Sequence, residues 1–392
     1  MKKIGLCLIL SSLLLLLGGC WDLNNIENLN FVNAIGMDYA NQEYIAYGQM
    51  VDYATTAKQE NGKSTQPSIV WVGQGRGKTV NLAITNLYQT AQNRIIWSHV
   101  GAMVLSERMI QHGFDDMNDA NLRYRELRVT PWIYGTHENM DQLFSTQSFF
   151  NLSHLSTLLH EPIETYRQRS WIQPMRYLYF ISDILEPGKT VALPSVSINK
   201  DQWTTNQKAT AKLEISGAFI IHNDVYKGWL DNAQLRGLRW MNTRTKRSPI
   251  VIRDDGKAIA TVSLEKPHVQ VNSRSGKDQK PKYSIRVQLI GNIVDLYKPI
   301  TEKTIQQKTE AAVENELRLT YKESLNIRAD VFQLEYYLYK DHYPQWQAQN
   351  QQHLLRLDED SLVDIQVHVD ILNTGMTRVG DLSPVHGFTN KE

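Results

Sequence analysis

The first twenty residues constrain this chain most, because they set the compartment in which the rest must fold. Two lysines precede an uncharged apolar run over residues 4–17, and Gly18-Gly19-Cys20 follows. A basic start, a short apolar run and small residues form the layout of an export signal. The run is about 14 residues long, whereas a membrane-spanning helix needs about 20. The sequence therefore predicts a signal peptide over residues 1–19 rather than a permanent span.

Cys20 is the expected site of lipid attachment. The small pair before it resembles the lipobox of bacterial lipoproteins, in which the leader is cut between Gly19 and Cys20 and the cysteine carries a thioether-linked diacylglyceryl group with acyl chains such as palmitate. The alternative is an ordinary buried cysteine in an apolar segment, but charge, length and small residues all favour the leader. We expect Cys20 to become the N-terminus of a lipid-anchored protein.

Composition excludes several classes for the mature chain. The only other cysteine, Cys7, lies in the leader, so neither a disulfide nor a cysteine-ligated metal site is expected. About 370 residues remain, enough for two or three domains. The formal charge of +1 becomes about −1 once Lys2 and Lys3 are removed, and no later segment is strongly basic or apolar over about 18 residues. Nucleic-acid binding and further membrane spans are therefore not expected.

The first half of the mature chain alternates strands and helices. A strand pair is expected around the turn-forming Asn41-Gln42, and apolar residues at helical spacing predict a helix over 79–93. This order indicates an α/β region. The expected strands cover 31–38, 44–52, 69–73, 95–105 and 129–135, with short helices between 106 and 185.

The polar stretch 199–208 is the expected domain boundary, which gives an N-terminal α/β domain over 20–200 and a C-terminal α+β domain over 207–392, with a subdivision near 245–255. Beyond it, strands alternate with tight turns. The expected hairpins are 213–222 with 225–229, 250–254 with 257–264, and 262–271 with 283–296 around an exposed loop at 272–281, and a strand follows at 362–372.

Residues 301–325 give the clearest helix. Apolar or small side chains recur every fourth residue on one stripe, Thr301 is an expected N-cap, and the opposite face mixes both charge signs. We expect the stripe to pack on the preceding antiparallel sheet. The fold class is therefore α+β and multi-domain, with mixed or antiparallel sheets covered by helices and an N-terminal α/β region.

A glycine-rich motif, Gly73-Gln74-Gly75-Arg76-Gly77-Lys78-Thr79, follows a predicted strand and opens a helix, as a phosphate-binding loop does. That loop needs a glycine five positions before the Gly of Gly-Lys-Thr, where this chain has Val72. An exported protein also meets little nucleoside triphosphate. We therefore expect a glycine-rich turn into a capped helix, and no bound nucleotide.

No metal or nucleophile motif stands out, and no cofactor is expected. His99, His154, His160 and His342 are expected to be structural, and the acidic clusters at 115–116 and 358–360 to be exposed helix starts or turns. The aromatic residues over 336–346 fit either a protein-docking surface or packing.

Several elements of the sequence together match one known family. The most specific is the lipobox followed by Trp21-Asp22. The other matching elements are Ile26-Glu27, Phe31-Val32, Ala34-Ile35-Gly36-Met37-Asp38, Gly77-Lys78-Thr79, Ser98-His99-Val100, 123–128, Trp229-Leu230, Arg236-Gly237-Leu238-Arg239-Trp240, Tyr343-Pro344 and Trp346. With these elements the chain resembles the spore germination C-subunit lipoproteins. A departure lies at 330–334, where the family often has Gly after Phe332 and again two residues later.

The resemblance implies a non-enzymatic subunit of a nutrient germinant receptor, which works with a polytopic A subunit and a transporter-like B subunit at the outer face of the spore inner membrane. It also implies sheets covered by helices. The germinant, direct ligand binding and the partner surface stay open. The alternatives are a solute-binding lipoprotein that delivers a small molecule to a transporter, for which two similar lobes are expected, and an exported hydrolase.

Overall fold

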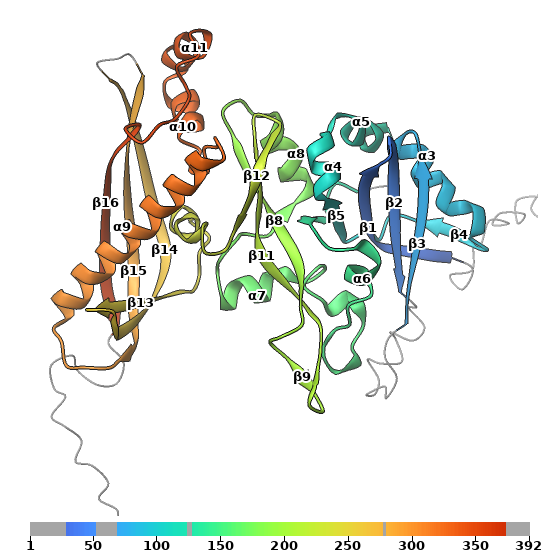
Figure 1. Cartoon of the computed structure of the whole chain (residues 1–392), viewed down its shortest axis with the longest axis horizontal. Helices are drawn as coiled ribbons and strands as arrows, with labels where there is room; N and C mark the ends of the chain where they lie inside the picture. Colours follow the sequence, from blue (N-terminus) through green and yellow to red (C-terminus); the bar gives the residue numbers. More distant parts are fainter. Residues whose placement is uncertain (1–28, 52–68, 124–127, 277–279, 374–392) are drawn as a thin grey trace, which may run out of the picture.

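Two β-sheets lie side by side in the computed structural model, which describes residues 29–51, 69–123, 128–276 and 280–373 (Figure 1). The larger sheet has the order β12-β11-β8-β6-β5-β1-β2-β3, with β4 beside β1 and β7 beside β6. Its strands are β1 (Leu29–Ala40), β2 (Glu43–Val51), β3 (Val70–Gly77), β4 (Arg94–Ile96), β5 (Ala102–Ser106), β6 (Trp132–Thr136), β7 (Met175–Arg176), β8 (Thr190–Asn199), β11 (Lys212–His222) and β12 (Val225–Asp231).

The smaller sheet has the order β13-β14-β15-β16, and a separate two-stranded hairpin is formed by β9 (Thr204–Thr205) and β10 (Lys208–Ala209). The strand bounds are Ser248–Asp254 for β13, Lys257–Ser275 for β14, Pro281–Leu296 for β15 and Leu362–Asn373 for β16. Both large sheets mix parallel and antiparallel pairs, because β1, β5 and β6 run parallel while β13, β14 and β15 are antiparallel and β16 is parallel to β15. The predicted α+β class is confirmed.

Tight turns in the left-handed backbone region close the predicted hairpins. Asn41 and Gln42 have φ of 55° and 60°, and Asn223 and Asp224 have φ of 50° and 60°. Two successive residues with positive φ form the turn whose twist matches a β-hairpin, and Asn and Asp tolerate this region better than most residues. The hairpin predictions at these turns are confirmed, and Asp255-Gly256 closes β13 and β14 in the same way.

Helices cover both faces of the larger sheet. One face packs against α3 (Val80–Asn86), α4 (Glu107–His112), α5 (Asp115–Arg123) and α8 (Tyr177–Leu185). The other face packs against α6 (Met140–Phe144) and the chain that follows it. The short helices η2 (Leu87–Thr90), η3 (Phe149–Asn151), η4 (His154–Ser156) and α7 (Pro162–Gln168) complete this half. This double cover explains why β1 and β5 are buried over most of their length.

The predicted long helix is α9 (Glu302–Asn326), which lies across the smaller sheet (Figure 1). The Thr301 hydroxyl accepts a hydrogen bond from Thr304 N at 3.2 Å, so the predicted cap is confirmed. Five members of the predicted stripe are buried, namely Ile305, Thr309, Val313, Leu317 and Tyr321. The helices η5 (Arg236–Met241), α10 (Leu334–Asp341) and α11 (Tyr343–Gln351) complete the C-terminal half.

Sheet pairing crosses the polar stretch 199–208. β8 and β11 pair antiparallel from Asn199↔Lys212 to Thr190↔His222, so residues 200–211 leave the larger sheet and return to it. The stretch is polar because it forms the exposed β9–β10 hairpin. The sheets part between β12 and β13, close to the predicted subdivision at 245–255. The predicted boundary between two domains at residues 200–207 stays a prediction.

Two strand predictions are wrong in detail. The strand expected over 95–105 is interrupted at 97–101, because β4 pairs with the start of β1 and β5 pairs with its middle. The exposed loop expected over 272–281 is shorter, since β14 continues to Ser275 and β15 begins at Pro281. Cross-strand pairing outweighs the turn preference of the polar residues there.

Buried charged side chains lie where the two halves of the chain meet, and one of them, Arg239 of η5, lies 4.4 Å from the centre of the Trp171 ring. The Arg239 side chain is 2% exposed, and its Nη2 donates to both Glu316 oxygens at 3.0 and 2.8 Å. His222 Nε2 lies 3.3 Å from Glu335 Oε2, which links β11 to α10. Burial raises the pKa of Asp330 to about 6. We call Arg239, Glu316, His222, Glu335 and Asp330 the joint.

Candidate functional site

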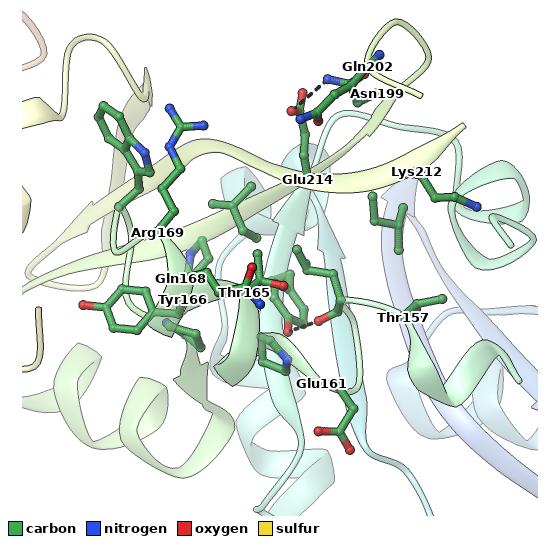
Figure 2. Close-up of a pocket in the computed structure, with 18 of the residues that line it drawn as sticks. Thr157, Glu161, Thr165, Tyr166, Gln168, Arg169, Asn199, Gln202, Lys212 and Glu214 are labelled. Atoms are coloured by element: carbon green, nitrogen blue, oxygen red, sulfur yellow. Dashed lines mark hydrogen bonds between the residues drawn. The ribbon is translucent and has the colours of Figure 1, made fainter. Parts of the chain in front are cut away.

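A cavity of about 540 Å³ lies between β11, α7 and the chain over 147–158 (Figure 2). Small-molecule sites are typically about 300–1,000 Å³ and combine apolar walls with a few polar groups. The walls here include aromatic side chains and both charge signs. This cavity is therefore the candidate binding site of the larger sheet.

The upper wall is held by hydrogen bonds that start at Asn199, where β8 ends. Asn199 Nδ2 donates to Glu214 Oε2 at 3.0 Å, and Asn199 Oδ1 accepts from the backbone N–H groups of Asp201 and Gln202, both at 3.0 Å. A side-chain amide that bonds to the backbone two residues on creates a turn. Asn199 therefore both ends the strand and holds Glu214 at the rim (Figure 2).

Lys212 fixes the chain beside the cavity. Its Nζ donates to the carbonyl oxygens of Gln147 and Ser148 at 2.9 and 3.0 Å and lies 4.7 Å from the centre of the Phe149 ring. Burial lowers the pKa of Lys212. These contacts use the ammonium group within the chain, so its main role here is to position the loop.

The floor of the cavity is structural. The Tyr134 hydroxyl donates to the carbonyl oxygens of Leu158 and Leu159 at 3.1 and 3.2 Å, and burial raises the pKa of this hydroxyl. The Tyr166 hydroxyl accepts from Asn242 Nδ2 at 3.2 Å, and burial also raises its pKa. Both phenols are therefore neutral at physiological pH.

The charged groups around the cavity do not converge. Figure 2 shows Glu161 and Arg169, at opposite ends of α7, pointing in different directions, and Lys212 pointing away from both. General acid–base chemistry needs such groups within hydrogen-bond reach of one substrate atom. The geometry suits the binding of a polar molecule with an apolar part better than it suits catalysis.

The predicted lipidation site, Gly19 and Cys20, lies outside the described residues. No helix among the described residues is both long and apolar enough to cross a bilayer. Within the described ranges, no three His, Cys, Asp or Glu side chains come together in a way that could hold a metal ion.

The glycine-rich motif is an edge strand and not a turn, which corrects the prediction. Gly75 and Gly77 belong to β3, and their strand pairs with β2. A Cβ on Gly75 would lie 2.2 Å from the Ala83 carbonyl oxygen, so the glycines let α3 pack directly on the strand. Thr79 Oγ1 accepts from Leu82 N at 3.2 Å, so the predicted helix cap is confirmed. The backbone is extended, unlike that of a phosphate-binding loop.

On the face that α6 covers, the predicted structural His154 is buried and His160 is half-buried. Burial lowers the pKa of His160 to about 4 and also lowers the pKa of His154, so both rings are neutral at pH 7. His160 Nε2 lies 3.2 Å from Gln49 Oε1. His99 contacts Phe31 with ring centres 4.8 Å apart, and His342 lies between α10 and α11. His154 and His160 fit the predicted structural role, whereas for His99 and His342, which are both exposed, it stays a prediction.

Sequence reasoning missed His222 and Glu335. The two residues are 113 positions apart, and neither stands in a motif that predicts a contact. The neighbouring groups confirm that their pairing is built in, because Thr190 Oγ1 lies 2.8 Å from His222 Nδ1 and Trp346 Nε1 donates to Glu335 Oε1 at 3.1 Å.

Comparison with known families decides the membership. The family model described as "Spore germination protein N-terminal domain" matches residues 22–198, and the model described as "Spore germination B3/ GerAC like, C-terminal" matches residues 216–375. The chain belongs to the germinant receptor C-subunit family. The gap between the two matches contains the β9–β10 hairpin.

Similar proteins come from Bacillus subtilis (strain 168). Spore germination protein KC is 21% identical over 406 residues, which cover 96% of this chain and 97% of that protein. Putative spore germination protein YfkR is 23% identical and spore germination protein A3 is 22% identical, each over 75% of this chain and over 75% and 74% of their own lengths. The crystal structure of the GerBC protein aligns with a TM-score of 0.53 at 15% identity, covering 86% of this chain and 97% of that chain, which shows a shared fold.

The family-like motifs of this chain serve packing. Asp38 accepts a hydrogen bond from Ser106 Oγ at 2.5 Å and pairs with Arg108, which fixes the end of β1 to α4. A Cβ on Gly237 would lie 2.6 Å from the Glu316 carbonyl oxygen, so this glycine lets η5 approach α9. Gln333, where the family often has Gly, has φ of 58°, a left-handed conformation that Gly adopts without strain.

Proposed function

We propose that this chain is the lipid-anchored C subunit of a spore nutrient germinant receptor. In this proposal the leader is cut between Gly19 and Cys20, and a diacylglyceryl group on Cys20 holds the protein on the outer face of the spore inner membrane. The chain acts without an enzymatic step of its own and assembles with the A and B membrane subunits. The observation that supports it most is the match of both family domains along one chain that begins with a lipobox.

The physical role of the anchor is to raise local concentration. Each acyl chain contributes about 0.8 kcal/mol per buried CH₂, so two chains give stable attachment where one is marginal. Restricting the protein to the membrane plane makes weak docking to membrane-embedded subunits effectively intramolecular. Assembly can then proceed through a modest protein interface.

The test replaces the cysteine. We expect Cys20→Ala to release the protein from membranes and to abolish nutrient-triggered germination, whereas Cys7→Ala, which changes the leader cysteine, should leave both unchanged. The measurements are membrane fractionation of spores, copurification with the A and B subunits from detergent extracts, and a germination assay over a nutrient panel. If Cys20→Ala protein still sediments with membranes and germination is normal, the proposal is wrong.

A second candidate function, small-molecule delivery to a membrane transporter, is favoured by one observation, the cavity of about 540 Å³. Two similar lobes around a cleft would be expected for a solute-binding protein, and the two sheets here differ in size and topology. Calorimetry of the purified mature chain with amino acids, sugars and nucleosides separates the two. Tight binding by this chain alone would favour delivery over the receptor role.

A further inference from the structure

Four large apolar side chains are exposed together at one end of the larger sheet. Phe150 is 89% exposed, Trp203 49%, Leu152 46% and Phe149 40%. They come from two segments, the loop between α6 and α7 and the chain that leads into the β9–β10 hairpin, which projects from the lower edge of the molecule in Figure 1. We call these four residues the apolar tip.

The apolar tip is held in place by specific contacts. The Phe149 and Trp203 rings meet edge to face with centres 5.0 Å apart, which ties the two segments together. Lys212 holds the loop through the carbonyl oxygens of Gln147 and Ser148, and the Ser148 hydroxyl donates to the Leu152 carbonyl oxygen. The side chains are therefore presented by a fixed scaffold, which lowers the entropy cost of binding.

The backbone of the tip is strained where the ring is most exposed. Phe150 has φ of 56° and ψ of 29°, and Asn151 has φ of 56°. A bulky residue in the left-handed region costs free energy and persists only when its surroundings hold it there. Exposing the phenyl ring to water adds a second cost in free energy, because transfer of apolar surface out of water is favourable. Moving the ring into an apolar phase would remove the second cost, and the free energy gained would offset the first.

The surroundings of the tip fit a lipid headgroup region. Trp and Phe are favoured at the boundary between water and hydrocarbon, and lysines beside them attract anionic lipids. Lys200 and Lys208 lie within five residues of Trp203 in the sequence, and the acidic residue Asp201 lies between them. Among the described residues, no other part of the chain covers Phe150.

The position of the tip along the chain allows this contact. Nine residue steps separate Cys20 from Leu29, where β1 begins, so an anchored body lies within about 30 Å of the bilayer. The loop that carries Phe149 and Phe150 begins at the end of α6, and this end is bonded close to the start of β1. Gln49, the strand partner of Ala34, donates through Nε2 to the Phe144 carbonyl oxygen at 2.7 Å. Ala34 is only five residues, about 17 Å, beyond Leu29.

We propose that the apolar tip inserts into the headgroup region of the membrane and orients the anchored body on it. The inference rests on the proposed function, because the lipid on Cys20 is what keeps the folded body close to the bilayer. The apolar tip would add a second membrane contact, made by side chains of the folded body. One lipid anchor alone leaves the body free to rotate about its tether. A second contact fixes which face of the body meets the membrane-embedded subunits.

The test uses the mature chain made as Cys20→Ala, so that it carries no lipid, with vesicles of phosphatidylglycerol and phosphatidylethanolamine. We expect this chain to sediment with vesicles. Phe150→Glu and Trp203→Glu should each lower the partition coefficient about tenfold or more, because each removes one aromatic ring from the apolar phase. Phe150→Trp should retain binding. The matched control is Leu185→Glu, since Leu185 is 66% exposed at the end of α8.

Two results would overturn the inference: no vesicle binding by the acyl-free chain, or equal losses in the tip and control variants. If the acyl-free chain does not bind vesicles and the Phe150→Glu protein no longer copurifies with the membrane subunits from spores, the inference is also wrong. The apolar tip would then bind a protein partner and not the membrane. Mass analysis of Cys20 in the natural protein distinguishes failure of this inference from failure of the proposed lipid anchor. If Cys20 is acylated but the acyl-free chain does not bind vesicles, only the membrane insertion of the apolar tip is contradicted.

Discussion

At the joint between the two sheets charged side chains are buried, whereas at the apolar tip aromatic side chains are exposed. Arg239 and Glu335 are 2% and 6% exposed, while Phe150 is 89% exposed. The buried charges have partners within the chain, such as Glu316 for Arg239 and His222 for Glu335. Among the described residues, the ring and cation contacts of Phe149, Phe150 and Trp203 are with each other and with Lys212.

The difference indicates that the joint stabilises the fold and that the apolar tip binds something outside the described chain. A buried charge costs several kcal/mol unless a partner and hydrogen bonds compensate it, so each ion pair of the joint stabilises the protein only while both partners are present. An exposed apolar cluster costs free energy that nothing in the described chain recovers, which marks a surface for binding. Removing one partner of an ion pair should therefore reduce stability at the joint, whereas substitutions at the tip should reduce association.

The largest effect is expected for Glu316→Ala. It removes both acceptors of Arg239 Nη2 and the acceptor of Trp240 Nε1 at 2.7 Å, leaving a buried guanidinium uncompensated. We expect the free energy of unfolding to fall by about 3–5 kcal/mol, measured by urea unfolding. Glu314→Ala, in an exposed pair with Arg318, should cost less than about 0.5 kcal/mol. Equal losses would show that the joint does not depend on this pair.

A pH dependence is expected from Asp330. Burial, the largest cause, raises its folded pKa to about 6, above the unfolded value of about 3.9. The folded state therefore takes up the proton first as pH falls, so Asp330 destabilises the protein above pH 6 and this penalty disappears between about pH 7 and pH 4.

Asp330→Asn should remove that penalty, which is up to about 3 kcal/mol for two pKa units. Its free energy of unfolding relative to the parent should fall as pH decreases from 7.5 to 4.5, with Asp360→Asn as an exposed control. The facing groups His222, Glu335, Arg328, His353 and Arg356 are unchanged in both variants. A constant difference across this range would contradict a raised pKa.

Lys212→Met tests the scaffold of the tip. The variant keeps an unbranched side chain and loses two hydrogen bonds to the loop. We expect a loss of about 1–2 kcal/mol and faster proteolysis within residues 145–153, measured by limited digestion. Lys208→Met, on the exposed hairpin, is the control. Unchanged digestion would mean that the loop is held by other contacts.

The smallest effect is expected for Phe150→Asn. Asn tolerates the left-handed backbone better than Phe, so stability should stay the same or rise by up to about 1 kcal/mol while vesicle binding falls. Phe149→Asn should lower both, because Phe149 packs on Trp203. A large loss of stability in Phe150→Asn would place this ring in the fold rather than at a membrane.

Local signals in the sequence predicted much of the fold. Asn41-Gln42 and Asn223-Asp224 define their hairpins because these residues accept positive φ, and Thr301 with the stripe of α9 defines the long helix. Each of these signals acts over a few residues. The α+β class follows from the order of such elements.

Non-local pairing could not be predicted in the same way. β8 and β11 pair with each other although the segment between them, residues 200–211, is polar like a linker. β16 pairs parallel to β15 although α9, α10 and α11 lie between the two strands in the sequence. The cavity is lined by several separate segments, so no motif marks it. The exposure of Phe150 depends on a left-handed backbone at a residue type that rarely adopts it, and sequence patterns carry no sign of this.

The most direct measurement is mass analysis of the mature chain isolated from spore membranes. We predict an N-terminal residue Cys20 that carries a thioether-linked diacylglyceryl group, with residues 1–19 absent. An unmodified cysteine, or a chain that still begins with its leader, would contradict the proposed anchoring of this chain.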